Sequence, residues 1–282
     1  MSAPTLPVDN TAGVMRAPTA PVIVFEDVHL AFEDNHVLRG VSFRLPQGET
    51  KALFGVAGSG KSTILKLALG LMQPDSGRIT VLGNEVTKMR ERELFPMRGH
   101  LGMVFQESAL FDSLTVRENV AYRLIEEHGV YDDETDRRVR EALRFVELEH
   151  TLELFPSELS GGMRRRVAIA RAIITEPELL LYDSPTGGLD PVTSNTIVEL
   201  ILKQRDVYKT SSLLVTHRLQ DAFTMATHQF DKKTNQVKTL PHGQYCDVPM
   251  SFLILRDGKV IFDGDVHQLA TTHDEYIKEY IS

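Results

Sequence analysis

Cysteine and tryptophan are almost missing from this chain. Its 282 residues contain one cysteine, Cys246, and no tryptophan. A single cysteine cannot form an intramolecular disulfide, so the class of small secreted domains stapled by disulfides is excluded. A reducing compartment such as the cytoplasm fits this composition better than a secreted location.

Long apolar runs and an excess of positive charge are also lacking. The longest apolar candidate, 179–182, has the length of a strand and falls far short of the ~18–20 residues of a membrane-spanning helix. The net charge of −8 disfavours a nucleic-acid binder with a broad basic surface, and basic runs such as 164–166 are too short to reverse this. We therefore expect no nucleic-acid partner, and we expect any membrane role to depend on partner proteins.

The first 21 residues do not resemble a signal peptide. They carry four prolines among small residues, without a basic start followed by an apolar core. We predict a flexible tail over 1–21, a folded domain over 22–265 and a C-terminal helix over 266–282.

The folded part alternates short apolar runs with helical stretches, which is typical of an α/β domain with a largely buried sheet. The segment 228–250 is polar and has no clear period, so it is interpreted as an insertion of unknown use. The predicted strands are 22–25, 41–45, 50–54, 179–182, 213–215, 252–255 and 260–262, and the predicted helices are 61–71, several within 107–175, and 192–204.

A phosphate-binding loop is the strongest motif. Residues 55–62 read Gly-Val-Ala-Gly-Ser-Gly-Lys-Ser and match G-x-x-x-x-G-K-[ST] between a predicted strand and helix. Backbone N–H groups in such a loop wrap phosphates, the lysine reaches the β- and γ-phosphates, and the final hydroxyl contacts Mg²⁺. An ordinary glycine-rich turn is the competing interpretation. The residues predicted to contact the nucleotide here are Gly55, Gly58, Ser59, Gly60, Lys61, Ser62 and Thr63.

Two further features strengthen this prediction. Asp183 ends the apolar run 179–182, where phosphate-loop ATPases place a Mg²⁺-organising aspartate, although a simple turn would also use Asp. Residues 159–163 read Leu-Ser-Gly-Gly-Met ahead of a helical run over 164–174. Serine and two glycines before a helix can form a second anion cradle, and an ordinary serine N-cap is the alternative.

Together these motifs resemble the ABC ATPase family over about 22–265. The resemblance implies an α/β nucleotide-binding domain with a RecA-like phosphate-loop core, a β subdomain and a helical insert at about 107–175. It also implies ATP and Mg²⁺ as cofactors. In this family the signature loop of one subunit closes over the γ-phosphate bound by the other, so Ser160, Gly161 and Gly162 are expected to act in trans within a dimer.

Four other positions match the family one at a time. Gln106 resembles the glutamine that senses Mg²⁺ and the attacking water, and Asp190 lies in a Gly-Leu-Asp-Pro segment that resembles the loop at the dimer seam. His217 resembles the switch histidine that contacts the γ-phosphate, and Phe32 has the place of the aromatic that stacks on adenine. Each match has an ordinary alternative. Gln106 could simply be a polar residue that ends a strand, and Asp190 could belong to a type I turn. His217 could be a surface histidine, and Phe32 could be a core phenylalanine.

Ser184 departs from the family pattern. The residue after the Mg²⁺-organising aspartate is usually a glutamate that polarises water, and a serine hydroxyl cannot act as a general base near neutral pH. Slow hydrolysis through positioning by His217 and the 188–191 loop is our favoured explanation. The alternatives are a different ATPase partner with an intact site, and an engineered change that traps ATP.

The segments 105–121 and 156–166 and the terminal 276–281 resemble lipid-transport ATPases of the Mla/Mce type. That resemblance implies a second ATPase subunit in a homodimer, transmembrane permease subunits, a membrane-anchored lipid-binding protein, and a cytoplasmic location on the inner face of the cell membrane. The apolar residues Phe105, Leu110 and Phe111 in the first of these segments could equally form a hydrophobic docking face for a permease of any other transporter. A soluble ABC ATPase and a non-hydrolysing ATP-binding regulator remain as other classes.

Overall fold

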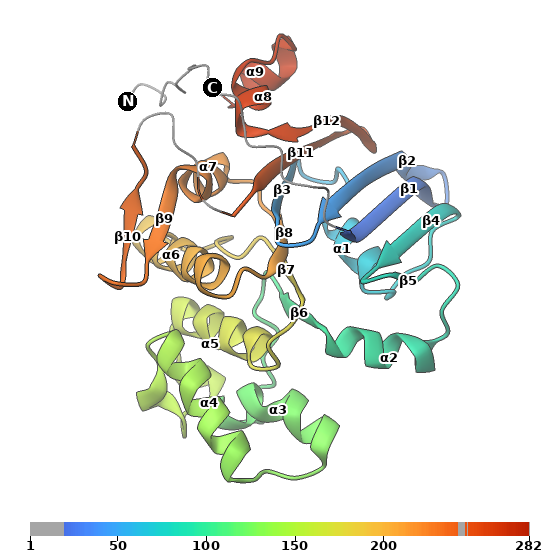
Figure 1. Ribbon diagram of the computed structural model, residues 1–282. Coiled ribbons are helices and arrows are strands. Elements are labelled where there is room, and N and C mark those ends of the chain that lie inside the picture. Colours follow the sequence, from blue (N-terminus) through green and yellow to red (C-terminus); the bar gives the residue numbers. More distant parts are fainter. Residues whose placement is uncertain (1–19, 242–245, 247, 282) are drawn as a thin grey trace.

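The computed structural model describes residues 20–241, 246 and 248–281 (Figure 1). Nearly all of the predicted flexible tail lies outside the described residues, and the first strand begins at Pro21. Within the described part, no helix has both the length and the apolar content needed to span a bilayer.

An antiparallel sheet of four strands covers one side of the molecule. Its order is β2 (Asn35–Pro46), β1 (Pro21–Phe32), β4 (Ser76–Val81), β5 (Asn84–Glu85). β1 and β2 pair from Pro21↔Pro46 to Phe32↔Asn35, so both strands are much longer than the predicted 22–25 and 41–45. β1 has several register shifts along this pairing, and such bulges break the even alternation that sequence patterns rely on.

The central sheet has six strands in the order β12 (Lys259–Asp265), β11 (Met250–Arg256), β3 (Thr50–Gly55), β8 (Ser211–Val215), β7 (Leu179–Asp183), β6 (Leu101–Val104). β12 is antiparallel to β11, which it follows after the tight turn at 257–258, and the other pairs are parallel. Leu53 packs into the core shared with the antiparallel sheet, while Ala52 and Phe54 pack on the opposite face. This alternation buries β3 completely.

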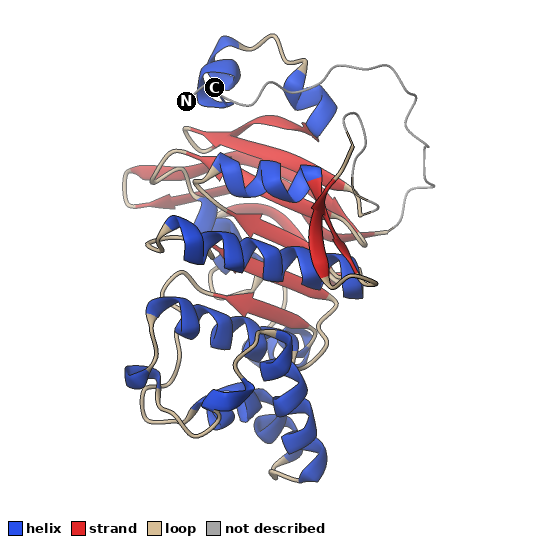
Figure 2. Cartoon of the chain, turned by 90° about the vertical axis from the view of Figure 1, so that its left-hand side faces the viewer, coloured by secondary structure: helices blue, strands red, loops and turns tan. Residues whose placement is uncertain are grey.

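Helices cover both faces of the central sheet and form a separate helical region. The helices around the sheets are α1 (Lys61–Ala68), α2 (Glu91–Gly99), α6 (Pro191–Tyr208), α7 (Leu219–Thr227), α8 (Val266–Ala270) and α9 (Glu275–Ile281). The helical region holds α3 (Val116–His128), α4 (Asp133–Phe145), the short 3₁₀ helices η1 (Glu149–Thr151) and η2 (Pro156–Glu158), and α5 (Gly161–Ile173). Figure 2 shows this region set apart from the block of strands.

Several helix boundaries differ from the prediction, including the end of α6, which reaches Tyr208 instead of 204. α1 ends at Ala68 instead of 71, because Gly70 adopts a left-handed φ of 66° where it packs against Leu94 of α2. α5 begins at Gly161, three residues before the predicted start. The single C-terminal helix predicted over 266–282 is two helices, since α8 ends at Ala270 and Asp274 starts a new one by accepting the N–H of Ile277 at 3.0 Å.

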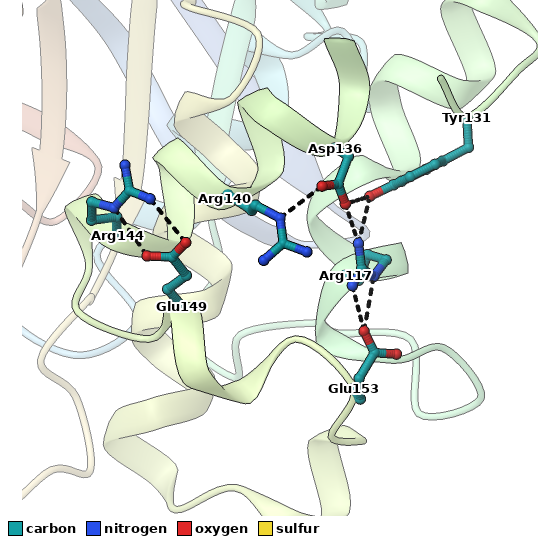
Figure 3. Close-up of polar contacts among 7 residues, drawn as sticks. All are labelled: Arg117, Tyr131, Asp136, Arg140, Arg144, Glu149 and Glu153. Atoms are coloured by element: carbon teal, nitrogen blue, oxygen red, sulfur yellow. Dashed lines mark hydrogen bonds and ion pairs between the residues drawn. The ribbon is translucent and has the colours of Figure 1, made fainter. Parts of the chain in front are cut away.

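A network of ion pairs holds the outer face of the helical region together (Figure 3). Arg117, in the first turn of α3, pairs with Asp136 of α4 and with Glu153 just before η2. Tyr131 donates to Asp136 at 2.8 Å, and Arg140 donates to the same carboxylate at 2.7 Å. The network therefore fixes the start of α3 relative to the chain segment that leads into α5.

The polar segment 228–250 contains a small hairpin that the sequence did not predict. β9 (His228–Asp231) and β10 (Gln236–Thr239) pair antiparallel beside α6. A buried ion pair on α6 anchors it: the Arg205 guanidinium donates to Asp206 and to the carbonyl of His228, and Asp206 accepts the N–H of Phe230 at 2.7 Å. The hairpin is thus attached to the last turns of α6 through main-chain contacts.

Replacing Asp206 by alanine is expected to lower the free energy of unfolding by about 3–5 kcal/mol, because the substitution leaves Arg205 buried without its partner. Urea unfolding measures this loss, and hydrogen exchange should show reduced protection across β9 and β10. Asp231→Ala removes a solvent-accessible pair with Lys238 and a turn hydrogen bond from the Lys233 N–H on the same hairpin, so the loss should be clearly smaller. Equal losses for both variants would contradict the anchoring role of Asp206.

Candidate nucleotide-binding site

The predicted phosphate loop connects β3 to α1 and depends on its glycines. Gly55, Gly58 and Gly60 have φ values of 154°, 79° and 95°. A Cβ atom at Gly60 would lie 2.8 Å from Leu38 of β2, and one at Gly55 would lie 2.6 Å from the Leu255 carbonyl of β11. Side chains are therefore excluded by backbone conformation and by close packing, which leaves main-chain groups to line the loop.

The N-terminus of α1 is suited to an anion. Its first turn contains no acidic residue, and no side chain caps it. The free N–H groups and the positive end of the helix dipole favour phosphate at this position.

Lys61, Ser62 and Asp183 lie together at the mouth of this loop. The Lys61 Nζ donates to the Gly55 and Val56 carbonyls, each at 2.8 Å, and the Ser62 hydroxyl donates to an Asp183 carboxylate oxygen at 3.1 Å. Burial lowers the pKa of Lys61 and raises the pKa of Asp183, and in both cases the opposite charge works against the shift. A phosphate with its cation would meet both an ammonium and a carboxylate here.

Gln106 and Ser184 follow the neighbouring parallel strands β6 and β7. Ser184 is 7% exposed, has a left-handed φ of 46° and donates its N–H to the Val215 carbonyl of β8 at 2.9 Å. A Cβ atom at Gly187 would lie 3.4 Å from the Ser184 Cβ and 3.6 Å from the Gln106 Cγ. The structure therefore places the Gln106 side chain against the turn that begins at Ser184, at the carboxyl edge of the sheet, where open α/β sheets bind ligands.

His217 is exposed after β8, and the loop that carries it is tied to the turn after Ser184. The Thr186 hydroxyl donates to Asp221 of α7 at 2.5 Å, and Asp221 is buried. Burial raises the pKa of Asp221, whereas the bond from Thr186 and the charges of Arg218 and His217 act in the opposite direction. Neither Thr186 nor Asp221 was predicted from the sequence, because a threonine in a turn and an aspartate in the first turn of a helix look like ordinary surface residues.

The predicted signature residues begin α5. Ser160 caps the helix by accepting the N–H of Met163 at 3.2 Å, and both Ser160 and Gly161 are exposed. A Cβ atom at Gly162 would lie 2.4 Å from the Thr193 methyl group of α6, so glycine allows the two helices to approach. The N-cap alternative for Ser160 is therefore observed, and it leaves the exposed face of the loop available.

Asp190 and Phe32 lie at two other exposed points. Asp190 caps α6, where it accepts the N–H groups of Val192 and Thr193, both at 3.0 Å. Phe32 ends β1 and is 48% exposed, which argues against the alternative of a core phenylalanine. The hairpin that carries Phe32 reaches the phosphate loop, because Val37 and Leu38 on its second strand pack at Gly60.

The comparisons with known proteins agree with this geometry. The family model described as ABC transporter matches residues 38–187. The chloroplast protein TRIGALACTOSYLDIACYLGLYCEROL 3 of Arabidopsis thaliana is 36% identical over 268 residues, which cover 92% of this chain and 73% of that protein. The methionine import ATP-binding protein MetN of Bifidobacterium longum is 38% identical over 206 residues, which cover 71% of this chain and 51% of its own length.

Solved structures also match. The ATP-binding cassette MJ0796, a dimer bound to ADP and phosphate, gives a TM-score of 0.72 at 28% identity and covers 86% of this chain and 98% of that chain. CbiO1 of Clostridium perfringens is part of the ABC transporter complex cbiONQ. It gives a TM-score of 0.73 at 26% identity, and the match covers 92% of this chain and 94% of CbiO1. The predicted fold class is thus confirmed, and the chain belongs to the ABC transporter family as an ATP-binding subunit with the ATPase fold of that family.

Proposed function

We propose that the phosphate loop holds ATP through Lys61 and the N-terminus of α1, and that the nucleotide is hydrolysed at the carboxyl edge of the central sheet. The observation that carries this proposal is the contact of Ser62 with Asp183 at 3.1 Å beside a glycine-lined loop. Gly58, Ser59, Gly60 and Thr63 complete the phosphate side of the site, and Phe32 supports the adenine.

Mg²⁺ fits the same residues. The Ser62 hydroxyl and the Asp183 carboxylate offer adjacent hard oxygen ligands, with Gln106 on the neighbouring strand end. Nucleotide-bound Mg²⁺ usually takes only one or two protein ligands, so this small donor set is sufficient. The ion would neutralise charge on the β- and γ-phosphates.

The active unit is a dimer in which each signature loop serves the other nucleotide. Ser160 and Gly161 are exposed at the start of α5, so the N-terminus of this helix is accessible to a partner subunit. This accessibility supports a contact in trans. Asp190 caps α6 on the same surface and would lie at the seam. The dimeric form of the MJ0796 cassette supports the same arrangement.

Hydrolysis is slow, because Ser184 replaces the usual base. The water is positioned by Gln106, His217 and the main chain of the 188–191 loop. Phosphoryl transfer depends mainly on positioning and charge, so turnover survives at a reduced rate.

The cargo is a phospholipid or a related lipid, moved by permease subunits together with a membrane-anchored lipid-binding protein. Support comes from the relative named for trigalactosyldiacylglycerol and from the Mla/Mce-type segments of the sequence. The permease would hold the chain on the cytoplasmic face of the membrane by contacting Phe105 and Phe111, which are 38% and 42% exposed. Methionine import is the second candidate, because relatives named MetN match at similar identity.

A stimulation assay separates the two cargoes. The tagged chain is purified with its membrane partners in mild detergent, and ATP hydrolysis is measured with added phospholipid micelles or added methionine. We expect a several-fold stimulation by phospholipid and none by methionine, with the Lys61→Ala complex as the blank. Stimulation by methionine alone would replace lipid by methionine as the cargo.

A further inference from the structure

Arg165 is the middle residue of the short basic run in α5, and it is buried. Its exposed fraction is 4%, whereas Arg164 beside it is exposed. Its guanidinium donates to the Phe105 and Ser184 carbonyls, each at 3.2 Å, and to the Gly187 carbonyl at 3.4 Å.

These three carbonyls belong to loops of the ATPase site. Phe105 directly precedes Gln106, Ser184 has the place of the usual base, and Gly187 begins the segment that runs to Asp190. The guanidinium is a planar fork with five donors, so a single arginine can hold three acceptors that converge from different directions. Lysine, a point charge on a flexible stem, cannot reproduce this geometry.

Stability alone does not explain the residue. Burial lowers the pKa of Arg165, and only the more distant charges of Glu107 and Asp183 favour the cation. Its Nε is also buried without a hydrogen-bond partner among the described residues. An unsatisfied buried donor and a buried cation both carry a cost that a smaller neutral side chain would avoid.

We propose that Arg165 is a positioning residue. It couples the loops that place the attacking water in one ATP site to the signature loop of the same chain, which serves the other ATP site. It fixes Gln106, Ser184 and Gly187 relative to α5, and the N-terminus of α5 carries Ser160. A shift of these loops when ATP binds therefore moves the signature loop of the same chain. The coupling between sites rests on the proposed dimer, whereas the effect of Arg165 on its own site does not.

The test compares Arg165→Met and Arg165→Lys with Arg166→Met. Arg166 is the next residue on α5, and its guanidinium contacts only the Val146 carbonyl of the helical region, at 3.2 Å, among the described residues. For Arg165→Met we expect kcat to fall by about 10²-fold, because small displacements of positioned groups cost that much, while the KM for ATP and the melting temperature stay near the wild-type values. Arg165→Lys should recover only part of the loss, and Arg166→Met should behave like the wild type.

A double-mutant comparison gives the second readout. Ser184→Glu should raise turnover in the wild-type background and much less in the Arg165→Met background, because the turn that presents position 184 is no longer held. The same gain in both backgrounds, or a parallel fall of kcat, ATP affinity and melting temperature, would overturn the proposal. Light scattering with and without ATP tests the proposed dimer separately from the role of Arg165. A wild-type chain that stays monomeric with ATP would refute the dimer. The kcat comparison would still decide whether Arg165 positions the loops of its own site.

Discussion

Restoring a glutamate at position 184 is expected to raise ATP turnover by about 10²-fold or more, since a positioned general base contributes roughly 10²–10⁴-fold. Ser184 begins the turn that leads to Gly187, directly after Asp183, and the Gln106 side chain lies against this turn. The main chain there is fixed by bonds to Val215 and Arg165, so the new carboxylate would extend from an established position. Steady-state hydrolysis of Mg-ATP by Ser184→Glu and wild type measures the gain.

Two controls make this result interpretable. Ser184→Gln has nearly the same volume as the glutamate variant but no base, so it should show no gain. A gain in both variants would mean that side-chain size controls the rate. No gain in either variant would contradict the view that the missing base limits turnover.

Replacing Lys61 by alanine is expected to lower turnover by about 10²–10³-fold, because it removes a preorganised cationic donor from the developing charge on the phosphates. The Lys61 ammonium lies against two loop carbonyls and is attracted by the Asp183 carboxylate, so it is held at the phosphate side of the site. Binding of a fluorescent ATP analogue should weaken in parallel.

Lys66→Ala is the matched control for this change. Lys66 is exposed on the same helix, five residues further along; its charge acts on Asp183 less than that of Lys61 does, and its loss changes the net charge equally. It should leave turnover and ATP binding near the wild-type values. If both lysine variants lose activity to the same extent, overall charge rather than the Lys61 contact is responsible.

The places of the proposed site residues in the fold were predictable from the sequence, because these residues lie at or just after strand ends. The loop 55–62 lies between β3 and α1 as predicted, and Asp183 ends β7. Parallel strands bring their carboxyl ends to one edge, so a motif at each strand end is enough to place Ser62 beside Asp183. Their roles in binding remain predictions that the variants above test.

Other features depend on contacts between distant segments. Arg165 lies on the face of α5 that also carries the buried Ala168, Ile169 and Ala172, a spacing of three, four and seven residues that could have shown its burial. The β9–β10 hairpin is short and its second strand is largely exposed, so it has no apolar alternation to detect. Its anchor is the buried Arg205–Asp206 pair, which in sequence looks like two surface charges.

α2 and the break between α8 and α9 depend instead on local capping interactions. Pro96 lies inside α2 and argues against a helix in any sequence pattern, yet the helix persists with a capped first turn, in which Arg90 donates its N–H to Glu93 at 2.8 Å. At the C-terminus, one helix was predicted over 266–282, but α8 ends at Ala270 and the cap at Asp274 begins a second helix.

Steady-state ATP hydrolysis by the purified wild-type chain, with Lys61→Ala as the blank, tests the central claim that this site turns over ATP without the usual glutamate. The account predicts Mg²⁺-dependent phosphate release that is slow but clearly above the blank. Release equal to the blank, under conditions where ATP binding is demonstrated and Ser184→Glu is active, would contradict it and identify a chain that holds ATP without hydrolysing it.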